Sequence, residues 1–323
     1  MKRIGLLVTI LLLPTVCLAQ DDSAEVEVTQ ISGSLYKLTV DEFVNIVALV
    51  GPDGVLLVDS GFPETAEKVR AVLRKLGSDR IRYIAHTHAD YDHVAGNPVL
   101  GANATTLSHP KTRERLLELI DIRHPYFLDF PKQAVPSITS GEIVTIFFNS
   151  EEVILIPMAG GHTDTDMVVY FKQANVACLG DILTPDSFPV VKLDMGGDVE
   201  TLIANIESLG ERFPDDVTLV VGHGRDPTKK DLEGYSRMLH ETTRTISEAM
   251  KSGKSCEDMK AENLLEAWAN WSGTVFEEVD TDMWIETVCR YLSSNQEKNR
   301  GSATYHRRRC FYPRPCGTAR RIM

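Results

Sequence analysis

Long apolar segments and an excess of positive charge are both lacking in this chain of 323 residues. The N-terminal apolar run, Ile4–Leu13, is much shorter than the roughly 20 residues that a membrane-spanning helix requires. Asp and Glu number 46 against 34 Lys and Arg, which gives a net charge of −12. Because phosphate groups and anionic lipids repel an acidic protein, neither nucleic acid nor a membrane surface is expected as its main partner.

Cysteine is also infrequent, with six residues in the chain. In an oxidising compartment, Cys256 could pair with Cys289, or Cys310 with Cys316. Cys178 lies in a short apolar run, which predicts a buried thiol that packs as a small hydrophobic side chain.

Residues 1–20 have the features of a signal peptide. Lys2 and Arg3 give a positive start, the apolar run follows, and Cys17-Leu18-Ala19 offers a small-residue cleavage site. We therefore expect the mature protein to be exported and to be periplasmic or secreted, without stable membrane insertion after the signal is removed. A lipoprotein acylated at Cys17 is the alternative, although Val16 is bulkier than such a signal prefers.

The first part of the mature chain predicts several β-strands followed by a helix. Four segments between residues 26 and 58 are rich in β-branched and aromatic residues and are separated by turn residues, which is typical of hairpins. An amphipathic helix at Glu64–Leu76 then leads into a buried strand at Ile81–Ala85. The four strands are expected at Val26–Ile31, Leu35–Val40, Val44–Val50 and Val55–Val58.

The same order of strands and then helices returns in the second half. Between the halves, Asp121–Ser140 is rich in proline and aromatic residues and could be a lid over a site or a packed surface loop. We expect residues 21–295 to form one domain and residues 296–323 to form a basic, disordered tail. The further expected elements are strands at Ile143–Phe148, Val153–Ile156, Met167–Phe171 and Val176–Leu179, and helices at Lys111–Ile120, Val199–Leu209, Lys229–Met250 and Thr281–Leu292.

The stretch Ile84–Asn97 concentrates residues that can do chemistry. It places three histidines and two aspartates between His86 and His93, directly after a predicted strand. A solvated polar loop would explain such a cluster, but its density favours a divalent-metal site. Three later strands end in the same way, each followed by a single His or Asp beside glycine, and a shared site would explain all of them. These residues are His162, Asp181 and His223.

The motifs resemble those of the metallo-β-lactamase superfamily. T-H-A-D-Y-D-H-V-A-G-N at Thr87–Asn97 is similar to its T-H-x-H-x-D-H-x-G-G-N signature. Gly160–Phe171, Cys178–Asp181 and Val220–Gly224 resemble its remaining motifs in the same order, and the similarity covers about residues 30 to 250. The resemblance implies an α/β protein with a four-layer αββα sandwich, in which two sheets lie face to face with helices outside.

The resemblance also implies a set of metal ligands. It places His88, Asp90 and His162 at a first ion, Asp92, His93 and His223 at a second, and Asp181 as a bridge between them. His86 is then a bystander. An alternative register, His86-Thr87-His88-Ala89-Asp90, would require a histidine in place of Tyr91.

Asp90 departs from the family pattern, which has histidine at this position in most members, and Ala95 replaces a glycine. We expect two zinc ions, but an oxygen ligand makes the first site harder, which favours iron or manganese there. The short side chain of Asp90 could also leave the first ion weakly held. Tyr91, Asp166 and the loop Asp186–Asp198 are further candidates for contacts to substrate or ligands, without assigned roles.

The ligand set implies hydrolysis of a small-molecule substrate. A metal-bound hydroxide would attack an ester, a thioester or an amide, β-lactams included, and Asp92 would act as the catalytic residue that orients the hydroxide. A diiron-type oxidoreductase of the same fold is a second interpretation, because a carboxylate at Asp90 resembles that branch of the superfamily. A non-catalytic metal-binding protein is a third, if Asp90 has disabled the first site.

Overall fold

The computed structural model describes residues 26–309, and the side chains of residues 26–295. The expected signal peptide, Cys310 and Cys316 lie outside the described residues. The first sheet has seven strands in the order β1-β2-β3-β4-β5-β6-β7, of which β1 to β4 are antiparallel and β4 to β7 parallel. These strands are β1 (Val26–Ser32), β2 (Leu35–Val40), β3 (Val44–Gly51), β4 (Gly54–Val58), β5 (Ile81–Ala85), β6 (Thr105–Ser108) and β7 (Ile138–Thr139).

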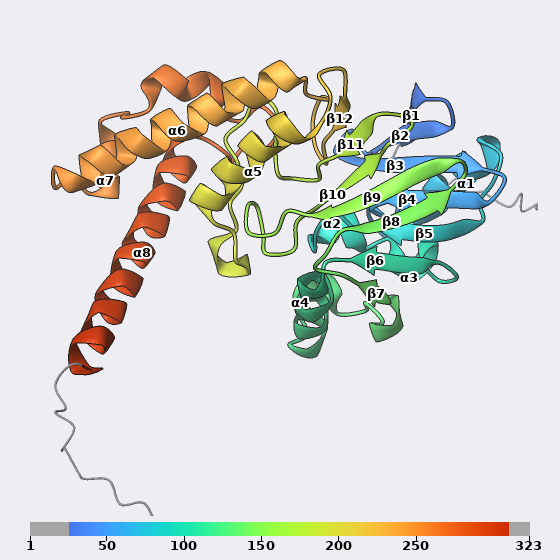
Figure 1. Ribbon diagram of the computed structural model, residues 1–323, viewed down its shortest axis with the longest axis horizontal. Coiled ribbons are helices and arrows are strands. Elements are labelled where there is room, and N and C mark those ends of the chain that lie inside the picture. The colour runs from blue at the N-terminus through green and yellow to red at the C-terminus, as the bar shows by residue number, and fades with distance from the viewer. Residues whose placement is uncertain (1–25, 310–323) are drawn as a thin grey trace, which may run out of the picture.

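The second sheet has five strands in the order β12-β11-β10-β9-β8, with only the β11–β12 pair parallel. Figure 1 shows this sheet lying over the first, with α5, α6 and α7 gathered at one side of the sandwich. The strands are β8 (Val144–Phe148), β9 (Glu151–Pro157), β10 (Met167–Phe171), β11 (Val176–Cys178) and β12 (Thr218–Val220). The helices are α1 (Ala66–Lys75), α2 (Tyr91–Val94), α3 (Asn97–Leu100), α4 (Pro110–Asp121), α5 (Val199–Arg212), α6 (Lys229–Lys251), α7 (Cys256–Ala261) and α8 (Thr281–Arg309).

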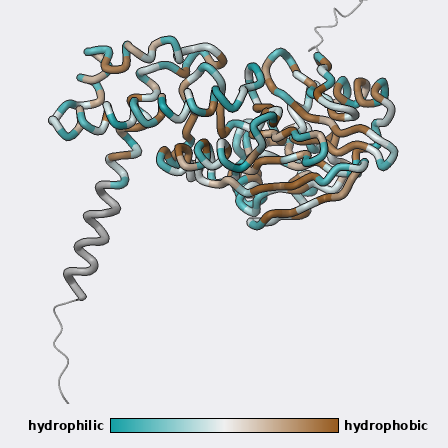
Figure 2. The backbone as a smooth tube through the Cα atoms, turned by 45° about the horizontal axis from the view of Figure 1, so that its top comes forward, coloured by the Kyte–Doolittle hydropathy of each residue, from teal (hydrophilic) through white to brown (hydrophobic). Residues whose placement is uncertain are grey.

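Three apolar clusters separate four layers. Alternate residues of β3 face opposite ways, so that Val47 packs between the two sheets while Ile46 packs against α1 and α3 on the outer face. In β10, Val169 faces the space between the sheets and Val168 faces α5 and α6. Strands β3 and β10 are therefore apolar on both faces. Figure 2 shows the apolar runs of the sandwich as brown segments of the backbone. The fold is the four-layer αββα sandwich that the sequence predicts.

The stretch Asp121–Ser140 is in part a packed connection. It holds two short 3-10 turns, η1 (Pro125–Phe127) and η2 (Lys132–Ala134), and the edge strand β7, which sequence patterns did not predict. Phe127 and Phe130 are buried against Leu116 of α4 and Val94 of α2. The aromatic residues of this stretch thus anchor it beside the motif that follows β5.

Helix α8 crosses the expected domain boundary. A basic, disordered tail was expected from residue 296, and the helix is described from Thr281 to Arg309. The segment from 296 to 309 contains no proline, the residue that most strongly breaks a helix. The rest of the expected tail, residues 310–323, lies outside the described residues.

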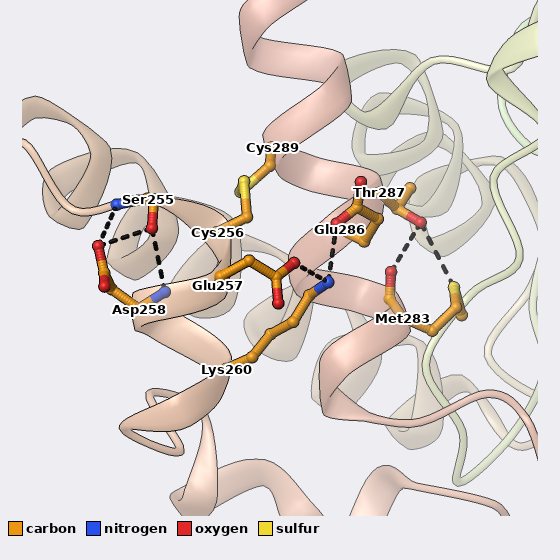
Figure 3. The surroundings of a disulfide bond; sticks show 9 residues. All are labelled: Ser255, Cys256, Glu257, Asp258, Lys260, Met283, Glu286, Thr287 and Cys289. Atoms are coloured by element: carbon orange, nitrogen blue, oxygen red, sulfur yellow. Dashed lines mark hydrogen bonds and ion pairs between the residues drawn. A yellow bond between two sulfur atoms is a disulfide. The ribbon is translucent and has the colours of Figure 1, made fainter.

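A disulfide links α7 to α8. Cys256 pairs with Cys289, as one of the two predicted pairings requires, and Lys260 contacts both Glu257 and Glu286 beside it (Figure 3). Cys178 is a buried free thiol, as expected. Among the helices of the described residues, none has the length and apolarity needed to cross a membrane.

Candidate metal centre

Seven predicted site residues converge at one edge of the sandwich, because the strands that precede them end there. His88 and Asp90 follow β5, and Asp92 and His93 lie in the short helix α2. Two further strands lead to Asp181, which follows β11, and His223, which follows β12, while His162 lies in the turn between β9 and β10. At this edge Asn45 of β3 donates its backbone N–H to the carbonyl of Gly222 at 2.8 Å, which joins the two sheets.

The side chains form two groups. His88, Asp90, His162 and Asp181 offer ligand atoms within 4.8 Å of one another, and so do Asp92, His93 and His223. The Asp181 carboxylate also approaches the second group, at 3.4 Å from both His93 Nε2 and His223 Nε2. It therefore lies close to ligand atoms of both groups.

His86 is not a member of either group. It is fully buried beneath the motif, where its Nε2 is 2.9 Å from the side-chain nitrogen of Asn97. The structure therefore brings together the residues that the family resemblance implies as ligands, and His86 packs beneath the loop instead.

Each of the four histidines in the groups is held through Nδ1. This arrangement fixes the ring and aims Nε2 at the centre of the cluster, as metal-ligating histidines require. The partner is the Thr87 hydroxyl for His88 at 2.9 Å, Asp59 for His93 at 2.8 Å, the Val190 carbonyl for His162 at 2.6 Å and the Phe43 carbonyl for His223 at 2.9 Å.

The residues fit divalent cations. His88 Nε2 and Asp181 Oδ1 are buried and have no hydrogen-bond partner, although such atoms almost always find one. A Cβ at Gly222 would lie 2.2 Å from Asp181 Oδ1 and 2.7 Å from His93 Cε1, so the backbone itself makes room for the cluster. Converging imidazole nitrogens and carboxylate oxygens, two of which lack a hydrogen-bond partner, are a typical ligand set for transition metals.

Several histidines and aspartates of the cluster have shifted pKa values. Burial alone would lower the pKa values of the imidazoles, but the surrounding carboxylates raise that of His93 to about 9, that of His162 to about 9 and that of His223 to about 11. Burial likewise opposes ionisation of Asp90 and Asp181, yet the facing histidines hold their pKa values well below the usual range. Each ionised group of the cluster is therefore stabilised by the opposite charges beside it.

Asp90 reaches the first group despite its short side chain. Its Oδ2 lies 3.1 Å from His162 Nε2 and 3.3 Å from His88 Nε2. The same oxygen forms an ion pair with the ammonium of Lys192, which sequence reasoning missed. Lys192 belongs to the loop Asp186–Asp198, and its backbone N–H donates to the His162 carbonyl at 3.0 Å. The additional negative charge of Asp90 thus has a cation beside it.

Asp59 is a second residue that sequence reasoning did not assign to the site. It follows β4 with a positive φ of 65° and is buried. Its carboxylate accepts hydrogen bonds from the Thr87 N–H at 2.8 Å and the Thr87 hydroxyl at 2.7 Å, in addition to that from His93. The only signal in the sequence is Asp59-Ser60-Gly61 at a strand end, which is also an ordinary turn pattern.

Asp166 and Tyr91, which had no predicted roles, now have definite positions. Asp166 is buried and accepts hydrogen bonds from the backbone N–H of Thr163 at 3.0 Å and from its hydroxyl. It thereby shapes the turn that carries His162. Tyr91 packs on Phe62 and Phe127 beside Asp92.

The sandwich of two sheets and the cluster of histidines and carboxylates at its edge define an α/β protein with a metal-binding site. The chain belongs to the metallo-beta-lactamase superfamily, whose family model matches residues 39–224. That match includes all seven residues of the two groups and Asp59. No curated protein matches the chain.

Solved structures share the fold at low identity. A metallo-beta-lactamase from Pontibacter korlensis is 19% identical, with a TM-score of 0.56 over 67% of this chain and 99% of its own. A metallo-beta-lactamase from Hirschia baltica is also 19% identical, with a TM-score of 0.54 over 66% of this chain and 97% of its own. A double mutant of the sec-alkyl sulfatase PisA1 is 14% identical, with a TM-score of 0.58 over 73% of this chain and 45% of its own.

Proposed function

We propose that this protein is an exported hydrolase that holds two metal ions and cleaves an ester, a thioester or an amide, β-lactams included. Membership of the superfamily and the candidate metal site support a metal-dependent hydrolase in general. The observation that carries the proposal is that four histidines direct Nε2 into one cluster while Nδ1 holds each ring in place. In this proposal His88, Asp90 and His162 hold the first ion, Asp92, His93 and His223 the second, and Asp181 both.

Divalent ions held by these residues would lower the pKa of a bound water and polarise the carbonyl of the substrate. Among the three carboxylates, Asp92 is the residue best placed to orient that water. Its side chain is 20% exposed, against 11% for Asp181 and 9% for Asp90, so it is the most accessible of the three to solvent. Its Oδ2 is 3.0 Å from His223 Nε2, which keeps the other oxygen free to accept a hydrogen bond.

Zinc is the proposed metal in both positions, with iron or manganese as the alternative at the first. Imidazole suits zinc, whereas the additional carboxylate of Asp90 makes the first position harder. Lys192 counters the charge of Asp90, so that the pair brings no net charge to a position where histidine is the usual residue. We therefore expect the first position to keep its ion.

A diiron-type oxidoreductase is the second candidate, and Asp90 is the observation that favours it. An oxygen ligand at the first position is what harder, redox-active iron prefers over zinc. Iron in the purified protein together with consumption of oxygen would support this candidate.

Export is part of the proposal. The positively charged start and apolar run of residues 1–20 support it, and the Cys256–Cys289 disulfide is typical of oxidising compartments. Fractionation of cells that express the full chain, with N-terminal sequencing of the product, tests it. An uncleaved protein in the cytoplasm would contradict export.

The hydrolase proposal is tested by metal analysis and substrate hydrolysis together. The purified full chain should contain two metal ions per molecule and hydrolyse members of a panel of esters, thioesters and β-lactams. Asp92→Asn should lower kcat by at least about 100-fold, while Asp215→Asn, at a fully exposed carboxylate outside the cluster, should not change it.

The parent and an Asp90→His variant separate the remaining interpretations. One ion or none in the parent, with two in Asp90→His, would show that Asp90 has cost the first position its metal and would contradict the two-metal proposal. Two ions without hydrolysis of any substrate in the panel would favour the non-catalytic interpretation.

A further inference from the structure

Three phenylalanine rings from distant parts of the chain gather against the candidate metal centre on the side of His223. Phe43 lies in the turn between β2 and β3, Phe62 follows β4, and Phe276 precedes α8. The centroids of Phe43 and Phe276 lie 4.6 Å and 5.0 Å from that of His223, and 5.6 Å from each other. The Phe62 centroid is 6.3 Å from that of Phe43. We call these three residues the aromatic wall.

The aromatic wall is continuous with the metal-binding motif. The Phe62 ring centroid lies 6.2 Å from that of Tyr91, the residue immediately before Asp92. Tyr91 in turn lies 5.2 Å from Tyr126, whose side chain is 67% exposed. Aromatic surface therefore extends from His223, past the second group of ligands, to the packed stretch after α4.

The rings of the aromatic wall remain accessible to solvent. Phe43 is 36% exposed, and Phe62 and Phe276 are half-buried. A single exposed phenylalanine needs no explanation, but contiguous apolar rings beside a cluster of polar residues are typical of a ligand-binding surface. The exposed part of each ring is apolar surface, and covering it with an apolar group of a ligand would favour binding.

The position of Phe43 is fixed by the contacts that fix His223. The Phe43 carbonyl accepts the hydrogen bond from His223 Nδ1, and Val44 forms an isolated β-bridge with His223. The turn that presents Phe43 contains Asp41 and Glu42, both with positive φ, near 56° and 55°. This conformation is unfavourable for residues other than glycine and persists only where the surroundings enforce it. The Phe43 ring is therefore held beside His223 of the second group.

Phe276 is supplied by a segment beyond the family match, which ends at residue 224. The Thr274 hydroxyl donates to the Asp186 carbonyl at 2.6 Å, and the Phe188 N–H donates to the Trp271 carbonyl at 3.0 Å. These bonds attach the segment to the loop that carries Lys192. The C-terminal helical part of this chain thus completes the aromatic wall.

We infer that the aromatic wall binds an apolar aryl or alkyl acyl group, so that the preferred substrates are esters of hydrophobic carboxylic acids. The inference rests on the proposed hydrolase function. Hydrolysis adds the OH of water to the acyl carbon as the ester C–O bond breaks, and the remaining proton goes to the leaving oxygen, so no redox partner is required. The wall lies beside the second group, whereas Lys192 gives the first group a charged side chain. The acyl chain therefore points along the wall and away from Lys192.

The test compares three p-nitrophenyl esters, the acetate, the hexanoate and the phenylacetate, with the full chain as purified. We expect kcat/KM for hexanoate and phenylacetate to exceed that for acetate by at least about tenfold. Phe43→Ala and Phe276→Ala should each reduce this ratio several-fold, with Phe43→Leu intermediate. Phe147→Ala is the matched control, because Phe147 is 79% exposed on β8 and has no place in the wall, and it should leave the ratio unchanged. Equal kcat/KM for the three esters in the parent would overturn the inference while leaving the hydrolase proposal intact.

Direct binding separates the inference from catalysis. Calorimetry with the free carboxylate ions should show that phenylacetate binds more tightly than acetate to the parent protein. This difference in affinity should shrink in Phe43→Ala. If no ester is hydrolysed but phenylacetate binds in this ring-dependent way, the hydrolase proposal fails and the apolar subsite stands. If phenylacetate and acetate bind equally, the aromatic wall is not a ligand subsite.

Discussion

Replacing Asp59 with asparagine should weaken the metal centre although Asp59 is not itself a proposed ligand. The carboxylate accepts three hydrogen bonds, two from Thr87 and one from His93 Nδ1. An amide has one oxygen and one NH₂ group, so one of these donors must then face another donor. If the NH₂ group faces His93, the ring can avoid the clash only by moving its proton to Nε2, which removes the atom that would bind the second ion.

The magnitude follows from these contacts. Loss of an outer-shell partner of a metal-binding histidine lowers metal affinity by about 10–100-fold, which corresponds to about 1.4–2.7 kcal/mol. If the NH₂ group faces the Thr87 N–H instead, a buried donor is left unsatisfied, at a cost of about 1–3 kcal/mol in the free energy of unfolding. Asp59→Asn should therefore lose metal affinity, folding stability or both.

The assay is a competitive titration with a chromophoric chelator, combined with thermal unfolding of the metal-free protein. Asp79→Asn is the matched control, because Asp79 forms an exposed ion pair with Arg74 at 2.6 Å on the surface, and it should change neither quantity appreciably. A metal affinity for Asp59→Asn within about twofold of the parent, in a protein of unchanged stability, would refute the role of Asp59 in holding His93.

Three further predictions concern the backbone, the disulfide and pH. Gly222→Ala should abolish binding of at least one ion and destabilise the fold by about 1–3 kcal/mol, since its Cβ would lie 2.2 Å from Asp181 Oδ1. Gly210→Ala in α5, where an added Cβ would meet no atom within 4 Å, should not destabilise the fold. Equal metal content in the two variants would contradict the prediction for Gly222. Cys256→Ser should lower the free energy of unfolding in denaturant by about 3–4 kcal/mol, because the disulfide closes a loop between residues 33 apart in sequence, and the difference from the parent should disappear in reductant. In the metal-free protein, carboxylates overcome the effect of burial and raise the pKa of His93 to about 9 from its usual 6.5. The folding stability gained from the ionised imidazole is therefore complete below about pH 6.5 and is lost as pH rises towards 9. Metal affinity should rise over the same range because the bound imidazole is neutral, and a melting temperature of the metal-free protein that increases from pH 6.5 to 9 would contradict the reasoning.

The sequence by itself determined the layers of the fold and the main members of the candidate site. Alternation and apolar runs predict the strands from Val26 to Val58, because each strand must present apolar residues to the faces it buries. His88, Asp90, Asp92 and His93 lie within one short motif, so local spacing alone brings them together. His162, Asp181 and His223 could be added because glycine beside a polar residue at a strand end recurs at each of them.

Only the tertiary structure decided what surrounds that motif. Lys192 meets Asp90 across 102 residues of chain, and Asp59 meets His93 across 34, so no local pattern records either contact. Phe43, Phe62 and Phe276 each look like ordinary apolar residues in the sequence. They become one surface only when the loops of Phe43 and Phe276 meet at His223 and Phe62 comes to lie beside Phe43. Spacing along the chain specifies contacts within one strand, helix or loop, whereas contacts between loops depend on how the sheets and helices pack.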